Sequence, residues 1–211
     1  NHVSSIYNSN RLKGLHYLKQ IPFSDLKVFQ TIFKSIPDQL QLQLANSSTI
    51  RYAQLFDLPK TVSVFCNRGT SGIDGSSSTA VGAAFVSQVP TLLITGDLSF
   101  FYDSNAFWNA YLKKNFRIII INNQGGGIFR ILPGQKDTPT YDEYYETVHK
   151  RNAKDLCKSL GVGYSSVSSE WRLKRKLKSF FNPSNHPQVL EIFTPRKSND
   201  QILLNYFRAM Q

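Results

Sequence analysis

Residues 117–123 read RIIIINN, and this stretch decides the fold class. Four consecutive isoleucines, from Ile118 to Ile121, predict a strand with both faces buried, because a half-exposed strand would alternate apolar and polar residues. Shorter apolar runs at residues 61–66, 91–95, 163–167 and 188–193 predict further strands. The repeated alternation of strands with helical stretches predicts an α/β fold, a three-layer α/β/α sandwich with a mainly parallel central sheet.

Helices are expected between and outside these strands. Ser24-Asp25 can cap a helix whose apolar positions include Leu26 and Phe29. Other helices are expected at residues 79–86, 106–112, 152–160 and 171–180, and from about Asn199 onward. The chain contains no internal repeat, so we expect one domain over residues 23–211, with residues 1–22 as the remnant of a preceding linker.

Composition indicates a packed globular protein, since 41% of the 211 residues are hydrophobic. The chain starts with Asn1 rather than Met, and we therefore expect a piece of a longer protein. No targeting signal or apolar stretch of spanning length is evident, so we expect a cytoplasmic location and no membrane partner. Cys66 and Cys157 have no metal-site spacing and suggest no disulfide framework.

The formal net charge of +11 has three possible explanations. Lysines and arginines could neutralise nucleic-acid phosphates, attract a small anionic substrate, or balance acidic residues in another part of a longer protein. The densest basic run, residues 172–178, places leucines between its charges at helical spacing. It is therefore typical of a solvated helix face, and no nucleic-acid partner is expected.

Two polar side chains follow neighbouring predicted strands. Asp97 comes after the strand at residues 91–95, and Asn123 follows the isoleucine strand. One carboxylate with neutral oxygen ligands suits magnesium, which also takes phosphate oxygens and water. The glycines at residues 125–127 allow a backbone carbonyl to turn toward a ligand, and Ser99 offers a hydroxyl near a helix start. Asp97 alone could be an ordinary helix cap and Asn123 alone an ordinary turn residue, but the two together favour a metal site.

Gly96-Asp97, followed after 26 residues by Asn123, resembles the metal and diphosphate motif of thiamine-diphosphate enzymes. The resemblance implies the thiamine-diphosphate-binding fold, with thiamine diphosphate and Mg²⁺ (or Mn²⁺) as cofactors. The metal ligands that it implies are Asp97, Asn123 and the carbonyl of Gly125, and the cofactor contacts are Gly96 and Ser99. The common motif has a second glycine where this chain has Leu98. Gly96-Asp97-Leu98-Ser99 is similar to the variant in the menaquinone-pathway branch of the family.

A second segment, residues 67–75, reads NRGTSGIDG and resembles a stretch characteristic of the same branch. The resemblance implies that Arg68 contacts an anionic substrate and that Ile73 lies between the two rings of the cofactor. An arginine suits a carboxylate, because its guanidinium binds both oxygens and keeps its charge. Without the resemblance, the segment could equally be a surface loop with a solvated arginine.

Two further segments extend the resemblance. Residues 46–51, NSSTIR, are similar to the family's Asn-Ser-x-x-x-Arg, which implies that Ser47 approaches the cofactor and Arg51 a substrate carboxylate. Residues 128–133, IFRILP, resemble the family's Ile-Phe-x-x-Leu-Pro. The cofactor contacts that this segment implies are Ile128, Phe129 and Leu132, although packing alone would also explain such apolar residues.

The resemblance implies a decarboxylating carboligase, a transferase that adds a succinyl-semialdehyde unit from 2-oxoglutarate to isochorismate. In that branch, the pyrimidine-binding domain of a neighbouring subunit supplies the activating glutamate, and the intact enzyme is a homodimer or homotetramer. The motif around that glutamate is absent from residues 1–211, so we expect no catalytic residue here and no activity from this chain alone.

Three alternatives remain open from the sequence. The chain could belong to another thiamine-diphosphate carboligase of the acetolactate-synthase type, although Arg51 and Arg68 favour substrates with several carboxylates. It could be a basic α/β domain that binds nucleic acid, although it lacks a recognised module for that function. It could also be a degenerate scaffold, although the presence of both Asp97 and Asn123 argues against this.

Overall fold

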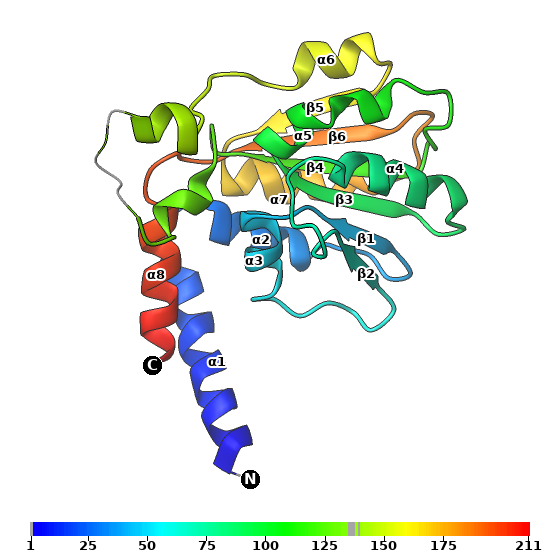
Figure 1. Cartoon of the computed structure of the whole chain (residues 1–211). Coiled ribbons are helices and arrows are strands. Elements are labelled where there is room, and N and C mark those ends of the chain that lie inside the picture. The colour runs from blue at the N-terminus through cyan, green and yellow to red at the C-terminus, as the bar shows by residue number, and fades with distance from the viewer. Residues whose placement is uncertain (1, 135–137, 139) are drawn as a thin grey trace.

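The computed structural model describes residues 2–134, 138 and 140–211, with side chains from Asn8 onward. The described residues form one sheet of six strands in the order β2-β1-β3-β4-β6-β5, and all neighbouring strands are parallel (Figure 1). The strands are β1 (Gln41–Leu44), β2 (Ser63–Cys66), β3 (Thr91–Gly96), β4 (Phe116–Asn122), β5 (Gly163–Val167) and β6 (Gln188–Phe193). The predicted α/β fold is confirmed.

The isoleucine strand β4 lies inside the sheet between β3 and β6. Its side chains point alternately to the two faces: Ile118 and Ile120 belong to one hydrophobic cluster, and Ile119 and Ile121 to another. All four are at most 5% exposed. The run is uniformly apolar because each face is covered by helices, as expected for a central strand of a parallel sheet.

Helices cover both faces of the sheet (Figure 1). One cluster joins α4, α5 and α6 to the sheet, and the other joins α2, α3 and α7 to it. The α-helices are α1 (His2–Gln20), α2 (Asp25–Phe33), α3 (Ser48–Ala53), α4 (Ser76–Val86), α5 (Asp97–Tyr102), α6 (Lys154–Ser159), α7 (Glu170–Phe180) and α8 (Asn199–Met210). Short helices of other types are η1 (Ser104–Phe107), η2 (Gly127–Arg130) and η3 (Tyr141–Tyr145). Among these described segments, none is both long and apolar enough to cross a membrane.

The first strand of the order, β2, is exposed at the edge of the sheet, with Val64 45% and Phe65 51% exposed. Burial on both faces therefore describes the central strands but not this one. The reason is positional: β2 pairs only with β1, and helices cover the sheet mainly over its interior strands.

The predicted helix at residues 106–112 is wrong. The chain enters α5 directly at Asp97, and only the short helix η1 follows, ending at Phe107. Phe100 on α5 and Ala106 and Phe107 on η1 belong to the same hydrophobic cluster. Their apolar pattern along the sequence therefore resembles that of a single helix placed further along the chain. Asp103 separates the two pieces, because its carboxylate accepts hydrogen bonds from the backbone N–H (2.7 Å) and the hydroxyl (2.6 Å) of Ser78.

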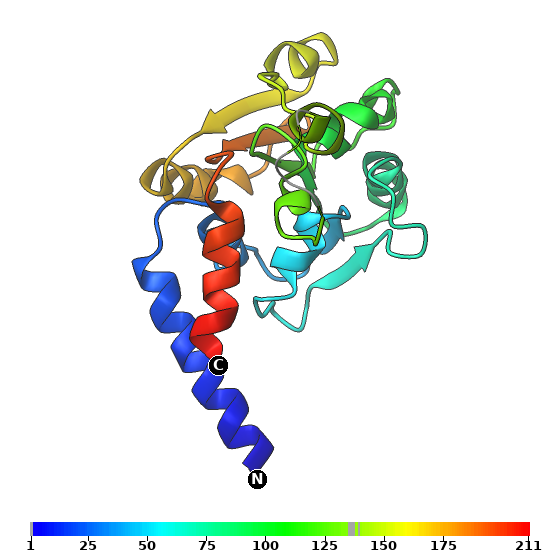
Figure 2. The ribbon, with the colours of Figure 1, turned by 60° about the vertical axis from the view of Figure 1, so that its left-hand side comes forward.

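Residues 2–20, within the segment predicted to be a linker remnant, form α1, which lies beside α8 in both ribbon views (Figures 1 and 2). Leu18 is 2% exposed, and the Tyr17 hydroxyl donates to the carbonyl of Ile202 at 3.1 Å. The rings of Tyr17 and Tyr206 also meet, with centroids 6.2 Å apart. The amino-terminal helix is therefore packed against the carboxyl-terminal one.

Candidate cofactor and metal site

The candidate site lies at the carboxyl ends of β1, β3 and β4. From β1 the chain moves to β2 on one side, whereas β3 pairs with β1 on the other side. The order of strands therefore reverses between β1 and β3, and parallel sheets bind ligands at such a switch point. Ser47 follows β1 and Asp97 follows β3 directly at this place.

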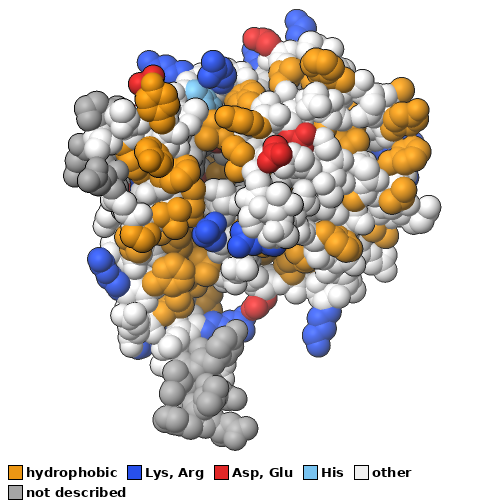
Figure 3. All heavy atoms as spheres, in the orientation of Figure 1, with side chains coloured by type: hydrophobic (Ala, Val, Ile, Leu, Met, Phe, Trp, Pro, Cys, Tyr) orange, Lys and Arg blue, Asp and Glu red, His pale blue; other side chains and the backbone are white. Residues whose placement is uncertain are grey.

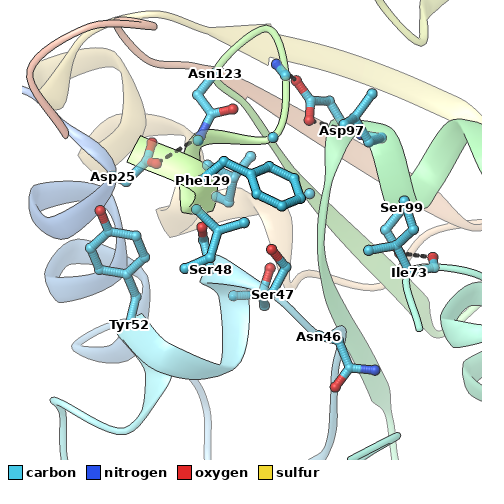
Figure 4. Close-up of a pocket in the computed structure, with 18 of the residues that line it drawn as sticks. Asp25, Asn46, Ser47, Ser48, Tyr52, Ile73, Asp97, Ser99, Asn123 and Phe129 are labelled. Carbon is cyan, nitrogen blue, oxygen red and sulfur yellow. Dashed lines mark hydrogen bonds between the residues drawn. The ribbon is translucent and has the colours of Figure 1, made fainter. Parts of the chain in front are cut away.

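A cavity of about 290 Å³ opens at this edge of the sheet. The space-filling view shows a hollow with hydrophobic side chains on its rim and Lys or Arg side chains beside it (Figure 3). The predicted site residues that line the cavity are Ser47, Ile73, Gly96, Asp97, Ser99, Asn123, Gly125, Ile128 and Phe129. The structure thus brings together residues from four segments that are far apart in the sequence (Figure 4).

Asp97 is a buried carboxylate that lines the cavity, only 2% exposed. Its Oδ1 accepts a hydrogen bond from the backbone N–H of Leu98 at 2.7 Å. Its Oδ2 accepts one from the backbone N–H of Gly125 at 3.0 Å and lies 3.2 Å from Nε2 of His149. The carboxylate is therefore held by the first turn of α5 and by the glycine loop after β4, and it faces the ring of His149.

Asn123 lies across the cavity from Asp97 (Figure 4). Its Nδ2 donates to Oδ2 of Asp25 at 2.9 Å. This bond identifies the amide nitrogen, because an ionised carboxylate only accepts hydrogen bonds. The amide oxygen of Asn123 consequently points away from Asp25, and no described residue donates a hydrogen bond to it.

Asp25 is a buried carboxylate at the start of α2 and was missed by the sequence-based prediction of the site. Its Oδ1 accepts a hydrogen bond from the Thr194 hydroxyl at 2.6 Å, and its backbone N–H donates to Asn199 at 2.9 Å. Burial raises the pKa of Asp25 to about 6, against the opposing effect of the hydrogen bonds from Thr194 and Asn123. Ser24 caps α2 as predicted, with its Oγ accepting from the Lys27 N–H at 3.4 Å.

The glycine loop, residues 125–127, packs tightly against the backbone of residues 145–147. Gly125 has φ +150°, and a Cβ at this position would lie 2.4 Å from the carbonyl oxygen of Glu146. The N–H of Gly126 donates to that same carbonyl at 2.6 Å. The Gly125 carbonyl accepts one hydrogen bond, from Gly127 at 3.0 Å, which leaves its second lone pair available.

Ser99 supports Ile73 in the structure, because its hydroxyl donates to the Ile73 carbonyl at 2.5 Å. The loop that carries Ile73 is also tied to the end of β1. Asn46, 3% exposed, donates from Nδ2 to the carbonyls of Asn67 (2.8 Å) and Gly72 (2.7 Å). Ile73 therefore reaches the cavity on a loop that two buried polar side chains anchor.

Ser47 has φ +65° and ψ −128°, a backbone conformation that residues other than glycine rarely adopt. Such strain often marks a functional site, where the surrounding structure enforces it. Arg51 lies on the same side of α3, as predicted, and its Nη1 donates to the Ser47 carbonyl at 2.8 Å. This bond fixes the turn from which Ser47 faces the cavity.

Three predicted site residues do not line the cavity. Arg51 and Arg68 are exposed side chains near it, on α3 and on the loop after β2. Leu132, 37% exposed, lines a neighbouring hollow, and Phe129 separates that hollow from the main cavity by lining both. The predicted metal residues and all predicted cofactor residues except Leu132 thus line the cavity, whereas the two predicted substrate residues do not.

Three functional candidates, Asp25, Asn46 and His149, could not be identified from the sequence. Asp25 is 98 residues from its partner Asn123, and its position in the first turn of a helix signals only a cap. Asn46 belongs to a segment singled out for Ser47 and Arg51, but its loop-anchoring role depends on partners 21 and 26 residues away. His149 stands alone in a polar stretch, where the sequence gives no sign of a partner.

The donors around the cavity fit a hard divalent cation. Asp97 offers a carboxylate, Asn123 an unbonded amide oxygen and Gly125 a carbonyl lone pair, and all three are oxygen ligands. Among the described residues, no group of three or more His, Cys, Asp or Glu side chains could hold a metal ion. Only Asp97 is a carboxylate among these three ligands, and the other lining carboxylate, Asp25, already accepts hydrogen bonds from Asn123 and Thr194, so phosphate oxygens and water would have to complete the coordination.

The family described as thiamine pyrophosphate enzyme, C-terminal TPP binding domain, matches residues 46–192. Several curated relatives carry the name 2-succinyl-5-enolpyruvyl-6-hydroxy-3-cyclohexene-1-carboxylate synthase. One from Christiangramia forsetii is 55% identical over 195 residues, which are 92% of this chain and 34% of the relative. One from Flavobacterium johnsoniae is 50% identical over 208 residues, 99% of this chain and 38% of the relative. One from Bacteroides fragilis is 41% identical over 194 residues, 91% of this chain and 35% of the relative. The chain therefore spans about a third of the length of these relatives.

Proposed function

Since the chain belongs to the family of C-terminal TPP-binding domains of thiamine pyrophosphate enzymes, we propose that its cavity holds the diphosphate of thiamine diphosphate through Mg²⁺ or Mn²⁺. The observation that carries the proposal is the convergence of Asp97 and Asn123 on one cavity, with the Asn123 amide oxygen bonded to no described donor. In this proposal the metal ligands are Asp97, Asn123 and the Gly125 carbonyl, and Gly96 leaves room for the diphosphate. A Cβ on Gly96 would meet no atom within 4 Å, which is consistent with open space at that point.

When bound, thiamine diphosphate supplies the nucleophile and electron sink for decarboxylation of a 2-oxo acid. The apolar part of the cavity suits its rings, because Ile73, Ile128 and Phe129 line one continuous hollow with the metal ligands. Ser99 holds Ile73 through its carbonyl, and Ser47 faces the same space. A volume of about 290 Å³ is at the lower end of ligand pockets, roughly 300–1,000 Å³. This supports a site that a further surface completes.

The chain corresponds to about a third of the length of its relatives. For the whole protein, we propose the activity that the relatives' name states. It would be a 2-succinyl-5-enolpyruvyl-6-hydroxy-3-cyclohexene-1-carboxylate synthase of menaquinone biosynthesis, located in the cytoplasm, with 2-oxoglutarate and isochorismate as substrates. Arg51 and Arg68 would bind substrate carboxylates, since both are exposed and each is tied to a lining residue. Arg51 bonds the carbonyl of Ser47, and Arg68 follows Asn67, whose carbonyl accepts from Asn46. The pyrimidine-binding domain of a neighbouring subunit would supply the activating glutamate, within a homodimer or homotetramer, and this chain alone would turn over no substrate.

The test is a thermal melt of the full-length protein with and without thiamine diphosphate and Mg²⁺. Ligand at about a hundred times its Kd should stabilise the fold by about 2.7 kcal/mol and so raise the melting temperature. Asp97→Asn keeps the shape of the side chain but removes its charge, so the Mg²⁺-dependent part of the rise should disappear. Asp155→Ala is the matched control, because Asp155 is an exposed carboxylate on α6, away from the cavity. An unchanged rise in Asp97→Asn would contradict the proposed metal site.

A further inference from the structure

His149 is buried, 7% exposed, although it lies in a polar segment between η3 and α6. Its ring and that of Phe101 form a T-shaped pair, with centroids 5.7 Å apart and planes at 88°. Its backbone N–H donates to the carbonyl of Gln124 at 3.2 Å. Together with the bond from Gly126 to the Glu146 carbonyl, this ties residues 146–149 along the outside of the glycine loop.

The hydrogen bonds of the ring determine where its proton lies. Nδ1 of His149 accepts a hydrogen bond from the backbone N–H of Arg151 at 3.1 Å. A ring nitrogen that accepts carries no proton, so the ring is neutral and protonated on Nε2. That Nε2 faces Oδ2 of Asp97 at 3.2 Å.

The Nε2 atom is also the unusual feature of this residue. It is buried and has no fully formed hydrogen bond among the described residues, so its proton approaches Asp97 without being aligned with it. Leaving a buried donor unsatisfied destabilises the fold, and an apolar side chain would avoid this cost. A small rotation of the Asp97 carboxylate would form the bond, as often happens when a ligand tightens a loosely aligned site.

We propose that His149 is a positioning residue for the metal carboxylate, with its Nε2–H directed at Oδ2 of Asp97. The inference rests on the proposed metal site and adds a residue to it. His149 and the Gly125 N–H would both donate to Oδ2 and so fix this oxygen of the carboxylate. Among the described residues, Oδ1 accepts only from the Leu98 N–H. Asp25 does the corresponding work for Asn123, whose amide nitrogen it holds. Each of the two metal-binding side chains thus has a buried partner that fixes its orientation.

Two substitutions separate this role from simple packing, because each keeps one half of the ring's hydrogen bonding. His149→Asn places an amide oxygen near the position of Nδ1, where it can accept from Arg151, but removes the donor toward Asp97. His149→Gln places an amide nitrogen near the position of Nε2, where it can donate to Asp97, but loses the Arg151 bond. If His149 only stabilised the turn at residues 149–151, the asparagine variant should behave more like the wild type. If His149 positions Asp97, the glutamine variant should retain more of the Mn²⁺ affinity.

The measurement is the affinity of the full-length protein for Mn²⁺ in the presence of thiamine diphosphate. The electron paramagnetic resonance signal of free Mn²⁺ reports how much metal remains unbound. Removing an orienting partner of a metal ligand lowers affinity by about 10–100-fold. We expect a loss of this size in His149→Asn and a loss of only a few fold in His149→Gln, with metal-free melting temperatures measured for both. Equal Mn²⁺ affinity in wild type and His149→Asn would overturn the inference while leaving the metal site intact. Equal Mn²⁺ affinity in wild type and Asp97→Asn would instead overturn the proposed function.

A measurement on the unsubstituted protein covers the case in which the asparagine variant does not fold. The nitrogen resonances of the His149 ring report which nitrogen carries the proton. We expect the Nε2–H form without metal, and slower exchange of that proton with water when Mg²⁺ and thiamine diphosphate are added. A ring protonated on Nδ1 would overturn the inference.

Discussion

The metal side, which lies in the cavity, and the arginine side, which lies beside it, are built differently. On the metal side, Asp97, Asn123 and Gly125 are all buried, and each is held by at least one further hydrogen bond. On the arginine side, which we define as Arg51 and Arg68, both side chains are exposed. Arg51 bonds only the carbonyl of Ser47, and neither arginine pairs with a carboxylate among the described residues. The proposed metal side is therefore held in place by the fold itself, whereas the arginine side leaves two cations available for an anionic ligand.

The rigidity of the metal side depends on an ionic cluster behind the glycine loop. The carboxylate of Glu146 is 1% exposed and accepts hydrogen bonds from Arg130, at the end of η2, and from Arg196, after β6. Asp142 lies near the same two arginines, but its side chain is 58% exposed. Because the Glu146 carbonyl also accepts from Gly126, one residue connects the glycine loop, η2 and the end of β6.

The largest effect is expected from Glu146→Gln. This change removes the buried charge that two guanidinium groups share, and breaking a buried ion pair costs roughly 3–5 kcal/mol. We expect a loss near the lower value, because both arginines are one-fifth exposed and Asp142 remains. Chemical denaturation monitored by circular dichroism measures the free energy of unfolding.

Asp142→Asn is the matched control for Glu146→Gln, since it touches the same arginines from an exposed position. An exposed pair contributes little because solvent screens it, so the control should lose clearly less stability. Equal losses in the two variants would mean that burial of Glu146 does not matter. The metal side would then be no more firmly built than the arginine side.

A smaller loss, roughly 1–3 kcal/mol, is expected from Gly125→Ala. The φ of +150° is available almost only to glycine, and the added Cβ would lie 2.4 Å from the Glu146 carbonyl oxygen. Gly96→Ala is the control: its Cβ would meet nothing within 4 Å, so the free energy of unfolding should change by less than about 0.5 kcal/mol. The control should nevertheless weaken thiamine-diphosphate binding, because its methyl group would enter the cavity. If Gly125→Ala were as stable as Gly96→Ala, the loop would not be clamped as the structure indicates.

The same contrast explains how much could be predicted from the sequence. Asp97 and Asn123 could be placed together because each directly follows a strongly apolar strand, and parallel strands end at one edge of the sheet. Their partners Asp25 and His149 could not, because those contacts join segments whose packing depends on the whole fold. The helix expected at residues 106–112 was misplaced for a related reason. Residues on two short helices share one core face, and local spacing cannot distinguish them from one helix.

The smallest effect on stability, and the sharpest test of the arginine side, is expected from Arg68→Ala in the full-length protein. Arg68 is exposed, so the free energy of unfolding should change by less than about 0.5 kcal/mol. Losing a hydrogen bond between charged groups costs about 1.5–3 kcal/mol, so kcat/KM for the carboxylate substrates should fall roughly ten- to hundredfold, mainly through KM. Arg172→Ala, which removes an exposed arginine from α7, should leave both quantities unchanged and thereby controls for net charge. If Arg68→Ala abolished thiamine-diphosphate binding while KM for substrate stayed the same, Arg68 would belong to the cofactor site, and the division of the cavity into two sides would fail.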